Sequence, residues 1–279
     1  MATRIVTDSS ADLPPELARR WNITVIPCNV VLGDVNYKDG VDLLPDEFYR
    51  RLVSTPRLPT TAQPSIADFQ AVYRDLLDQG HHVVSIHVSS KLSGTVNSAE
   101  QARASLGASV PIEIIDSRLA SIGLGLSTLA SAKLAWDGKP YQQVADQARR
   151  NLTKNRVLFI LDTLDYLEKG GRIGKAGAFL GSLLSIKPIL TLQDGEVHPV
   201  ARPRNRERAV RRTVELVREL APVRQLAVIY STEPDQAAEL RRQLSDLLPE
   251  DEIITTRFGA TLGTYVGPGA IGVALTQAE

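Results

Sequence analysis

Hydroxyl side chains gather in two short polar loops, each directly before a segment with helical periodicity. One loop is residues 60–65, Thr-Thr-Ala-Gln-Pro-Ser, and the other is residues 89–95, Ser-Ser-Lys-Leu-Ser-Gly-Thr. The first backbone N–H groups of a helix lack intrahelical partners and carry a partial positive charge, so hydroxyls beside a helix start can help to hold an anion. Thr60, Thr61 and Ser93 are therefore candidate anion-binding residues.

The same residues also suit ordinary structural roles. Ser65 and Ser93 are good helix N-caps, and capping alone would explain them. Capping does not explain the two threonines upstream of Ser65. The second loop follows the apolar run 83–88, and ligands of open α/β sheets bind beyond the carboxyl ends of strands. Gly94 would let a ligand approach the backbone closely.

Catalysis by these residues has weaker support. A nucleophilic Ser93 would need an imidazole base, and the nucleophile-elbow pattern Gly-x-Ser-x-Gly is absent. His87 lies in the middle of an apolar run, where we expect a core or wall histidine. No histidine and carboxylate cluster has the spacing of metal ligands, and the single cysteine is Cys28. A serine-dependent hydrolase acting on acyl esters remains the alternative.

A glycine-rich segment, residues 263–269, precedes the last apolar run. Three glycines and a proline in seven residues predict a tight backbone path. The segment is interpreted either as a simple turn or as a loop whose amides meet a ligand. Its spacing matches no nucleotide-binding loop, and no Gly-x-Gly-x-x-Gly turn follows a strand.

Short β-branched runs alternate with segments of helical period, which predicts an α/β fold with mostly parallel strands in the first half. Expected strands and apolar runs are residues 4–7, 24–32, 83–88, 112–115, 157–161, 226–230, 253–258 and 271–275, with a hairpin over 188–201. Expected helices include 65–79, 93–104 and 207–220. The pattern changes near Arg156, so we predict an N-terminal α/β domain, 1–160, and a C-terminal mixed-sheet α/β domain, 161–279.

Charge and hydropathy exclude several classes of protein. Thirty-two basic residues balance thirty-two acidic ones, so no long-range field attracts nucleic acid. No run approaches the ~20 apolar residues of a transmembrane helix, and the first residues lack the apolar core of a signal peptide. We therefore expect a soluble cytoplasmic protein without a transmembrane segment.

Taken together, the motifs resemble those of the DegV family, the fatty-acid-binding subunits of bacterial fatty acid kinase. The matching segments are residues 7–13, 60–65, 89–95, 116–117, 167–173, 186–190 and 267–269. Their order and spacing span almost the whole chain.

The resemblance implies a bound long-chain fatty acid whose acyl chain lies in a tunnel near the domain junction. Thr61 and Ser93 would hold its carboxylate by hydroxyl hydrogen bonds. A partner kinase related to dihydroxyacetone kinases would phosphorylate the acid, so this chain would carry no catalytic residue, nucleotide, metal or other cofactor.

One residue departs from the family pattern, which usually has histidine where this chain has Tyr265. A phenol donates a hydrogen bond but stays neutral at pH 7, so carboxylate binding is retained while a proton-coupled role becomes doubtful. Packing over the tunnel mouth is the other interpretation of Tyr265. The resemblance also implies that Arg202, Arg204 and Arg172 contact the kinase or the acyl phosphate. A solvated helix face is the simpler interpretation of the wider arginine-rich run.

Overall fold

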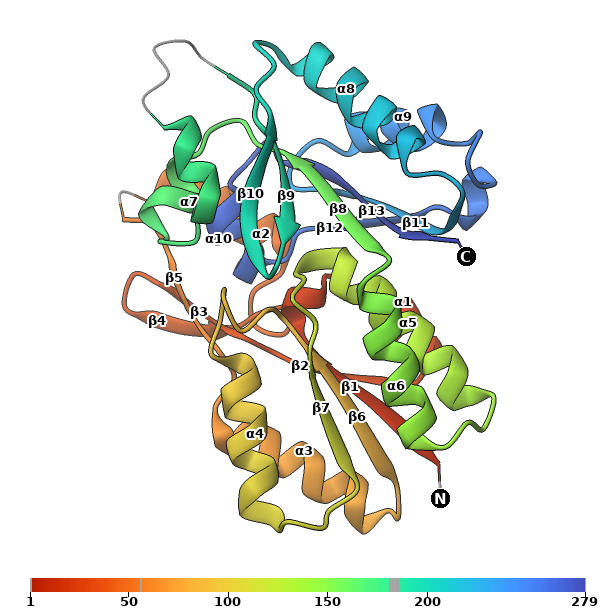
Figure 1. Cartoon of the computed structure of the whole chain (residues 1–279). Helices are drawn as coiled ribbons and strands as arrows, with labels where there is room; N and C mark the ends of the chain where they lie inside the picture. Colours follow the sequence, from red (N-terminus) through yellow and green to blue (C-terminus); the bar gives the residue numbers. More distant parts are fainter. Residues whose placement is uncertain (1, 56, 181–185, 279) are drawn as a thin grey trace.

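A computed structural model describes residues 2–55, 57–180 and 186–278 of the chain. Two sheets dominate it, one in the lower and one in the upper half of Figure 1. This α/β architecture, with one parallel and one mixed sheet, confirms the predicted fold class.

The lower sheet is parallel throughout. Its strand order is β2 (Ile23–Ile26), β1 (Thr3–Asp8), β6 (His82–His87) and β7 (Ile112–Asp116). One face is covered by α3 (Ile66–Asp78) and α4 (Thr95–Leu106), the other by α5 (Ser121–Trp136) and α6 (Tyr141–Leu152), while α1 (Pro15–Arg20) packs on β2. Because successive strand side chains point to opposite faces, Val6 packs in the α3 cluster and Ile5 in the α5 cluster.

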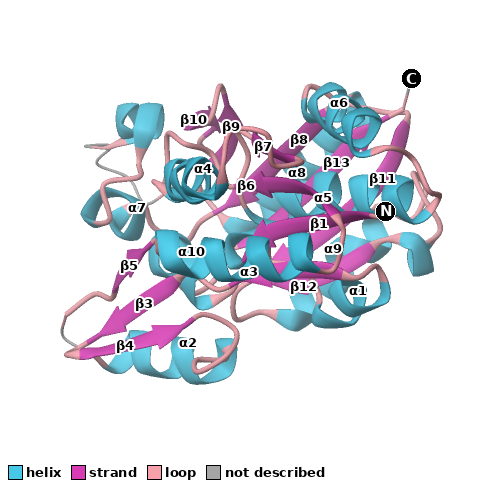
Figure 2. Ribbon diagram, turned by 90° about the horizontal axis from the view of Figure 1, so that it is seen from below, coloured by secondary structure: helices cyan, strands magenta, loops and turns pink. Residues whose placement is uncertain are grey.

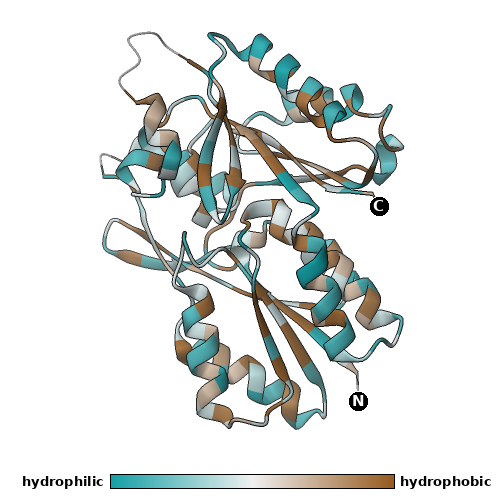
Figure 3. Cartoon of the chain, in the orientation of Figure 1, coloured by the Kyte–Doolittle hydropathy of each residue, from teal (hydrophilic) through white to brown (hydrophobic). Residues whose placement is uncertain are grey.

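The upper sheet is mixed. Its order is β10 (Glu196–Ala201), β9 (Ile189–Gln193), β8 (Asn155–Ile160), β13 (Ile271–Gln277), β11 (Val223–Tyr230) and β12 (Ile254–Arg257). Only the β11–β12 pair is parallel within this sheet. The predicted hairpin is β9–β10, and α8 (Arg206–Glu219) and α9 (Pro234–Gln243) cover the outer face. In Figure 3 the strands of both sheets are largely brown, whereas the outer helices carry much teal.

Helix α5 joins the two sheets in one core. Its residues 121–132 are all buried, and it packs against β1 below and against β8 and β13 above. A helix that is apolar on all sides belongs in the interior. Gly123 permits this close packing, because a Cβ there would collide with the side chain of Val157.

A third, antiparallel sheet closes one side of the molecule. It consists of β4 (Val35–Lys38), β3 (Asn29–Leu32) and β5 (Thr60–Ala62), flanked by α2 (Pro45–Ser54). Helix α10 (Ala260–Val266), from near the chain's end, packs against β3, β5 and α2. The remaining short elements are α7 (Asp165–Lys169) and the 3₁₀ turns η1 (Ser9–Ala11), η2 (Gly174–Phe179) and η3 (Glu250–Glu252).

Several local features differ from the sequence-based expectations. The apolar run 24–32 holds two strands in different sheets, β2 and β3, separated by Pro27 and Cys28. The first half of the glycine-rich segment 263–269 is helical, because α10 extends to Val266, and only residues after it form a turn. Gly94 rather than Ser93 is the N-cap of α4. By contrast, Ser65 is confirmed as the N-cap of α3, within a capping box completed by Asp68.

The division of the chain at residue 160 stays a prediction. Strand β8 pairs with β9 and β13, so residues 155–160 belong by hydrogen bonding to the upper sheet. In the described parts of the chain, no helix combines the length and apolarity needed to cross a membrane.

Candidate functional site

A cavity of about 880 Å³, counting the open space at its mouth, lies between the lower and upper sheets. The loops after β1 and β6 line one side. The chain leaves these two adjacent strands toward opposite edges of the sheet, from β1 to β2 and from β6 to β7. Ligands of parallel sheets bind beyond the carboxyl ends of the strands at such a switch point. The sequence analysis expected the loop after β6 to contact a ligand for the same reason.

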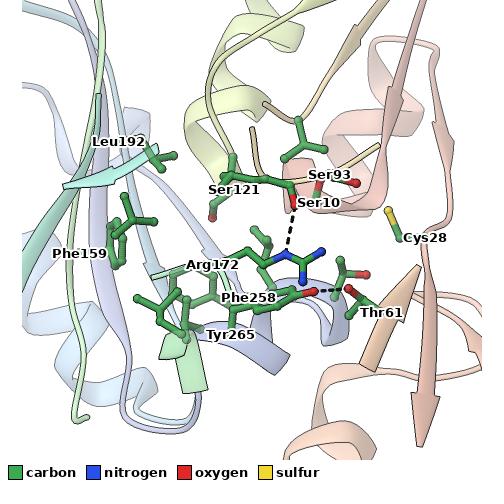
Figure 4. Close-up of a pocket in the computed structure, with 18 of the residues that line it drawn as sticks. Ser10, Cys28, Thr61, Ser93, Ser121, Phe159, Arg172, Leu192, Phe258 and Tyr265 are labelled. Atoms are coloured by element: carbon green, nitrogen blue, oxygen red, sulfur yellow. Dashed lines mark hydrogen bonds between the residues drawn. The ribbon is translucent and has the colours of Figure 1, made fainter. Parts of the chain in front are cut away.

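Most of the cavity wall is apolar. The apolar lining side chains are Ala62, Val88, Leu92, Ala120, Val157, Phe159, Leu167, Leu192, Val197, Phe258, Leu262 and Val266. Polar groups gather at one side, where Thr61 and Cys28 lie across the cavity from Leu192 and Phe159 (Figure 4). An apolar slot with polar groups at one end suits an amphiphilic ligand with a long hydrocarbon tail.

Thr61 and Tyr265 meet at the polar side of the cavity. The Thr61 Oγ1 and Tyr265 hydroxyl oxygens lie 2.5 Å apart (Figure 4). The tyrosine ring also packs, because a Cβ on Gly170 would lie 2.5 Å from it. Tyr265 therefore forms part of the cavity wall with its ring and brings its hydroxyl to Thr61, while a hydrogen bond from Tyr265 to a carboxylate stays a prediction.

Arg172 covers the ring of Tyr265. Its guanidinium carbon lies 5.1 Å from the ring centre. Its Nε donates to Leu92 O at 3.2 Å (Figure 4). Its Nη1 donates to Gly170 O at 2.7 Å. The half-buried cation is thereby fixed in the cavity wall, where it can attract an anionic head group.

Ser93 lies just before the N-cap of α4 and lines the same cavity as Thr61. Its Oγ is 2.8 Å from Thr95 Oγ1, and the Thr95 N–H donates to it at 3.4 Å. The N-cap residue, Gly94, supplies no side-chain cap, so this helix start keeps donors for an anion. The Gln63 side chain lies directly above Gly94.

The other predicted site residues lie outside the cavity lining. Thr60 is exposed, and neither Thr60 nor Gly94 is among the residues that line the cavity. Arg202 and Arg204 are exposed near the end of β10, and the guanidinium of Arg202 lies 5.7 Å from the Phe179 ring centre. Of the predicted arginines, Arg172 lines the cavity.

A buried hydrogen-bond chain beside the cavity was missed by the sequence analysis. Tyr73 OH donates to Ser85 Oγ at 2.8 Å, Ser85 Oγ is 2.7 Å from His87 Nε2, and His87 Nδ1 is 2.9 Å from Asp8 Oδ2. Ser85, His87 and Asp8 have no exposed surface, so their order resembles a catalytic triad without access for a substrate. His87 is confirmed as a core histidine.

Asp8 is the acceptor at the end of this chain. Ser10 N donates to it at 3.1 Å and Val88 N at 3.2 Å, and the Ser10 hydroxyl also donates. Burial pushes its pKa upward, but hydrogen bonds from His87, Ser10 and Val88 outweigh burial and hold the pKa below its usual value. Asp8 is therefore a carboxylate that fixes Ser10 at the cavity wall.

Two further carboxyl groups position α10. Asp39 accepts from Ala260 N at 2.9 Å and Thr261 N at 3.2 Å, and Asp12 accepts from Gly259 N at 2.8 Å. Burial raises the pKa of both groups, that of Asp12 well above its usual value. They serve as remote caps for the helix that carries Tyr265.

Hydrolytic or metal-dependent chemistry gains little support from this geometry. Within the described ranges, Ser93 makes side-chain hydrogen bonds with Thr95 and none with a histidine. The same ranges contain no cluster of three His, Cys, Asp or Glu side chains suited to a metal ion.

The sequence of the chain matches a known protein family and several of its members. The model of the DegV family, a family described as uncharacterised, matches residues 2–278. Protein DegV of Bacillus subtilis is 34% identical over 278 residues, which cover 98% of each chain. A DegV domain-containing protein of Deinococcus radiodurans is 37% identical over 281 residues, which cover 99% of this chain and 98% of the relative.

Several solved structures with the same fold are described by their binding of fatty acids. A DegV family protein from Thermus thermophilus, described by its fatty acid binding, superposes with a TM-score of 0.92 at 35% identity over 100% of both chains. DegV of Bacillus subtilis, described as a fatty acid binding protein, gives 0.89 at 32% identity over 99% of both. A stearic-acid-binding protein from Eubacterium ventriosum gives 0.90 at 27% identity over 98% of both.

Proposed function

Because the chain belongs to the DegV family, we propose that it binds a long-chain fatty acid in the cavity between its two main sheets. The observation that carries the proposal is the cavity itself, whose apolar wall ends at Thr61, Ser93, Tyr265 and Arg172. The solved relatives described as fatty-acid-binding support the same ligand class.

The tail supplies most of the binding free energy. A chain with ~15 buried methylenes gains roughly 12 kcal/mol, at about 0.8 kcal/mol each. Ordering the flexible chain and losing free translation offset much of that gain. The head-group hydrogen bonds therefore mainly orient the acid, with its carboxylate toward Thr61 and Ser93 and its tail toward Phe159.

The chain would act in the cytoplasm, where it would present this carboxylate to an ATP-dependent kinase of the dihydroxyacetone-kinase type. It would have no catalytic activity or cofactor of its own. The exposed Arg202 and Arg204 would contact the kinase or the acyl phosphate, since the guanidinium fork matches phosphate. The Arg202→Glu, Arg204→Glu double variant is expected to bind fatty acid normally but to lose acyl phosphate formation with the kinase. Unchanged turnover would exclude these arginines from the partner contact.

Thr61→Val and Ser93→Ala are each expected to weaken fatty acid binding about tenfold, because each removes a head-group hydrogen bond of ~1 kcal/mol or slightly more. Displacement of a fluorescent fatty acid measures the affinities. Thr60→Val is the matched control, since Thr60 is the exposed neighbour on the same strand. Wild-type affinity in both test variants would place the carboxylate elsewhere.

A further inference from the structure

Gly94 leaves room for a neighbouring side chain at the start of α4. Its φ is −77°, a value that residues with a Cβ adopt freely, so backbone conformation does not require a glycine there. A Cβ at this position would, however, lie 2.8 Å from Nε2 and 3.1 Å from Cδ of Gln63. The glycine therefore provides the space that the amide of Gln63 occupies.

The amide of Gln63 lies at the cavity mouth and has no protein partner of its own. Gln63 is exposed and lines the cavity together with Thr61 and Ser93. Its backbone is held in place, because Asn29 Nδ2 donates to Gln63 O at 3.3 Å and Pro64 restricts the residue before it to an extended conformation. The side-chain amide forms no hydrogen bond with any described residue.

The donor side of this amide lies next to a helix start that also presents donors. Nε2 is the amide atom nearest to the Cβ position of Gly94, and Oε1 is farther from it at 3.5 Å. Gly94 supplies no side-chain cap, so the start of α4 keeps unpaired N–H groups and a partial positive charge. Two sets of donors side by side require an acceptor, and a carboxylate offers two oxygens with free lone pairs.

We propose that Gln63 is a further head-group residue, whose amide donates a hydrogen bond to the fatty acid carboxylate above the start of α4. Gly94 is then a positioning residue, because it admits the amide to this place. The role deepens the proposed function and rests on it. It differs from the roles of Thr61 and Ser93 because their hydroxyls can donate or accept, whereas the side of the amide nearest the helix only donates.

The test compares tetradecanoic acid with tetradecanol, a neutral ligand of the same chain length, by displacement of a fluorescent fatty acid. Gln63→Glu is expected to weaken binding of the acid about twentyfold, because it places a second carboxylate beside the first. The affinity for the alcohol should not change. Gln101→Glu is the matched control, since Gln101 is exposed on the same helix and lies outside the cavity lining, so this variant should bind both ligands as the wild type does.

Gly94→Ala removes the amide from its place without changing Gln63 itself, because the added methyl group takes the space that the amide occupies. Gly94→Ala and Gln63→Leu are each expected to weaken binding of the acid about tenfold, as expected for the loss of a hydrogen bond to a charged group. The double variant should be little weaker than either single variant, because both substitutions remove the same hydrogen bond.

Wild-type affinity of Gln63→Glu for the acid, or an equal loss for acid and alcohol, would overturn the role of Gln63 while leaving fatty acid binding intact. Additive losses in the double variant would contradict the positioning role of Gly94. Failure of the wild-type protein to bind the acid would instead refute the proposed function.

Discussion

Leu192→Trp is expected to lower the affinity for long-chain fatty acids about fiftyfold. Leu192 lies on β9 and projects into the apolar side of the cavity, across from Thr61 (Figure 4). An indole there would occupy the space of about three methylenes, and each lost methylene costs ~0.8 kcal/mol. Titration with acids of increasing length measures the effect.

The loss should depend on chain length, because short acids do not reach the far wall. Val200→Trp on β10 is the control, since Val200 is 37% exposed and lies outside the cavity lining, and it should bind every acid as the wild type does. A Leu192→Trp variant that weakens short and long acids equally would place the tail elsewhere.

Asp8→Asn is expected to destabilise the protein by about 3–5 kcal/mol, because at least two buried donors lose a charged acceptor, at roughly 1.5–3 kcal/mol each. The carboxylate accepts hydrogen bonds from His87, Val88 N and both donors of Ser10, and an amide cannot accept all of them. Chemical denaturation measures the free energy of unfolding. Because Ser10 lines the cavity, ligand binding should weaken as well.

Asp12→Asn is the contrasting variant and is expected to cost about 1 kcal/mol or less. Burial raises the pKa of Asp12, so its protonated form is favoured, and an amide can still accept from Gly259 N and pair with Ser121. Equal destabilisation by the two substitutions would contradict the assigned protonation states.

Asp8 and Asp12 are expected to contribute to the stability of the protein in opposite pH ranges. The lowered pKa of Asp8 means that its contribution to stability is complete above the unfolded pKa, about 3.9, and is lost as the pH falls through the folded pKa. The raised pKa of Asp12 means that its contribution is complete below about 3.9 and is lost as the pH rises through the folded value. Melting temperatures of the Asp8→Asn and Asp12→Asn variants, measured as a function of pH, distinguish the two contributions.

Local sequence signals account for much of the fold. Ser65 and Asp68 form the capping box of α3 within four consecutive residues, and the turn Asp194-Gly195 joins β9 to β10 as predicted. The parallel lower sheet follows from the alternation of apolar runs and helices. Each of these features depends on residues close together in the chain, so pattern and propensity suffice to predict it.

The architecture around the cavity depends on contacts between distant segments, which a single sequence does not display. Thr60 and Thr61 form a strand rather than a loop, because they pair with β3. The glycine-rich segment becomes helical because its start is capped from a distance, with Asp12 and Gly259 separated by 247 residues. The Asp8–His87 contact likewise joins strands 79 residues apart.

The candidate head-group residues were predicted largely by resemblance and only partly by residue chemistry. Thr61, Ser93 and Tyr265 meet at one cavity, whereas Thr60 and Gly94 lie outside its lining. Thr261 also lines the cavity but carried no sequence signal, since nothing near it in the chain marks it as a cavity residue. Its place in the cavity wall is evident only in the structure, which shows that α10 lines the cavity.

The most direct test of fatty acid binding is to purify the protein from cells, extract it with organic solvent and identify the released lipid by mass spectrometry against a mock purification. A near-stoichiometric long-chain fatty acid is the expected result. Absence of lipid, together with no thermal stabilisation on adding long-chain acids, would contradict the account and assign the cavity to a different ligand.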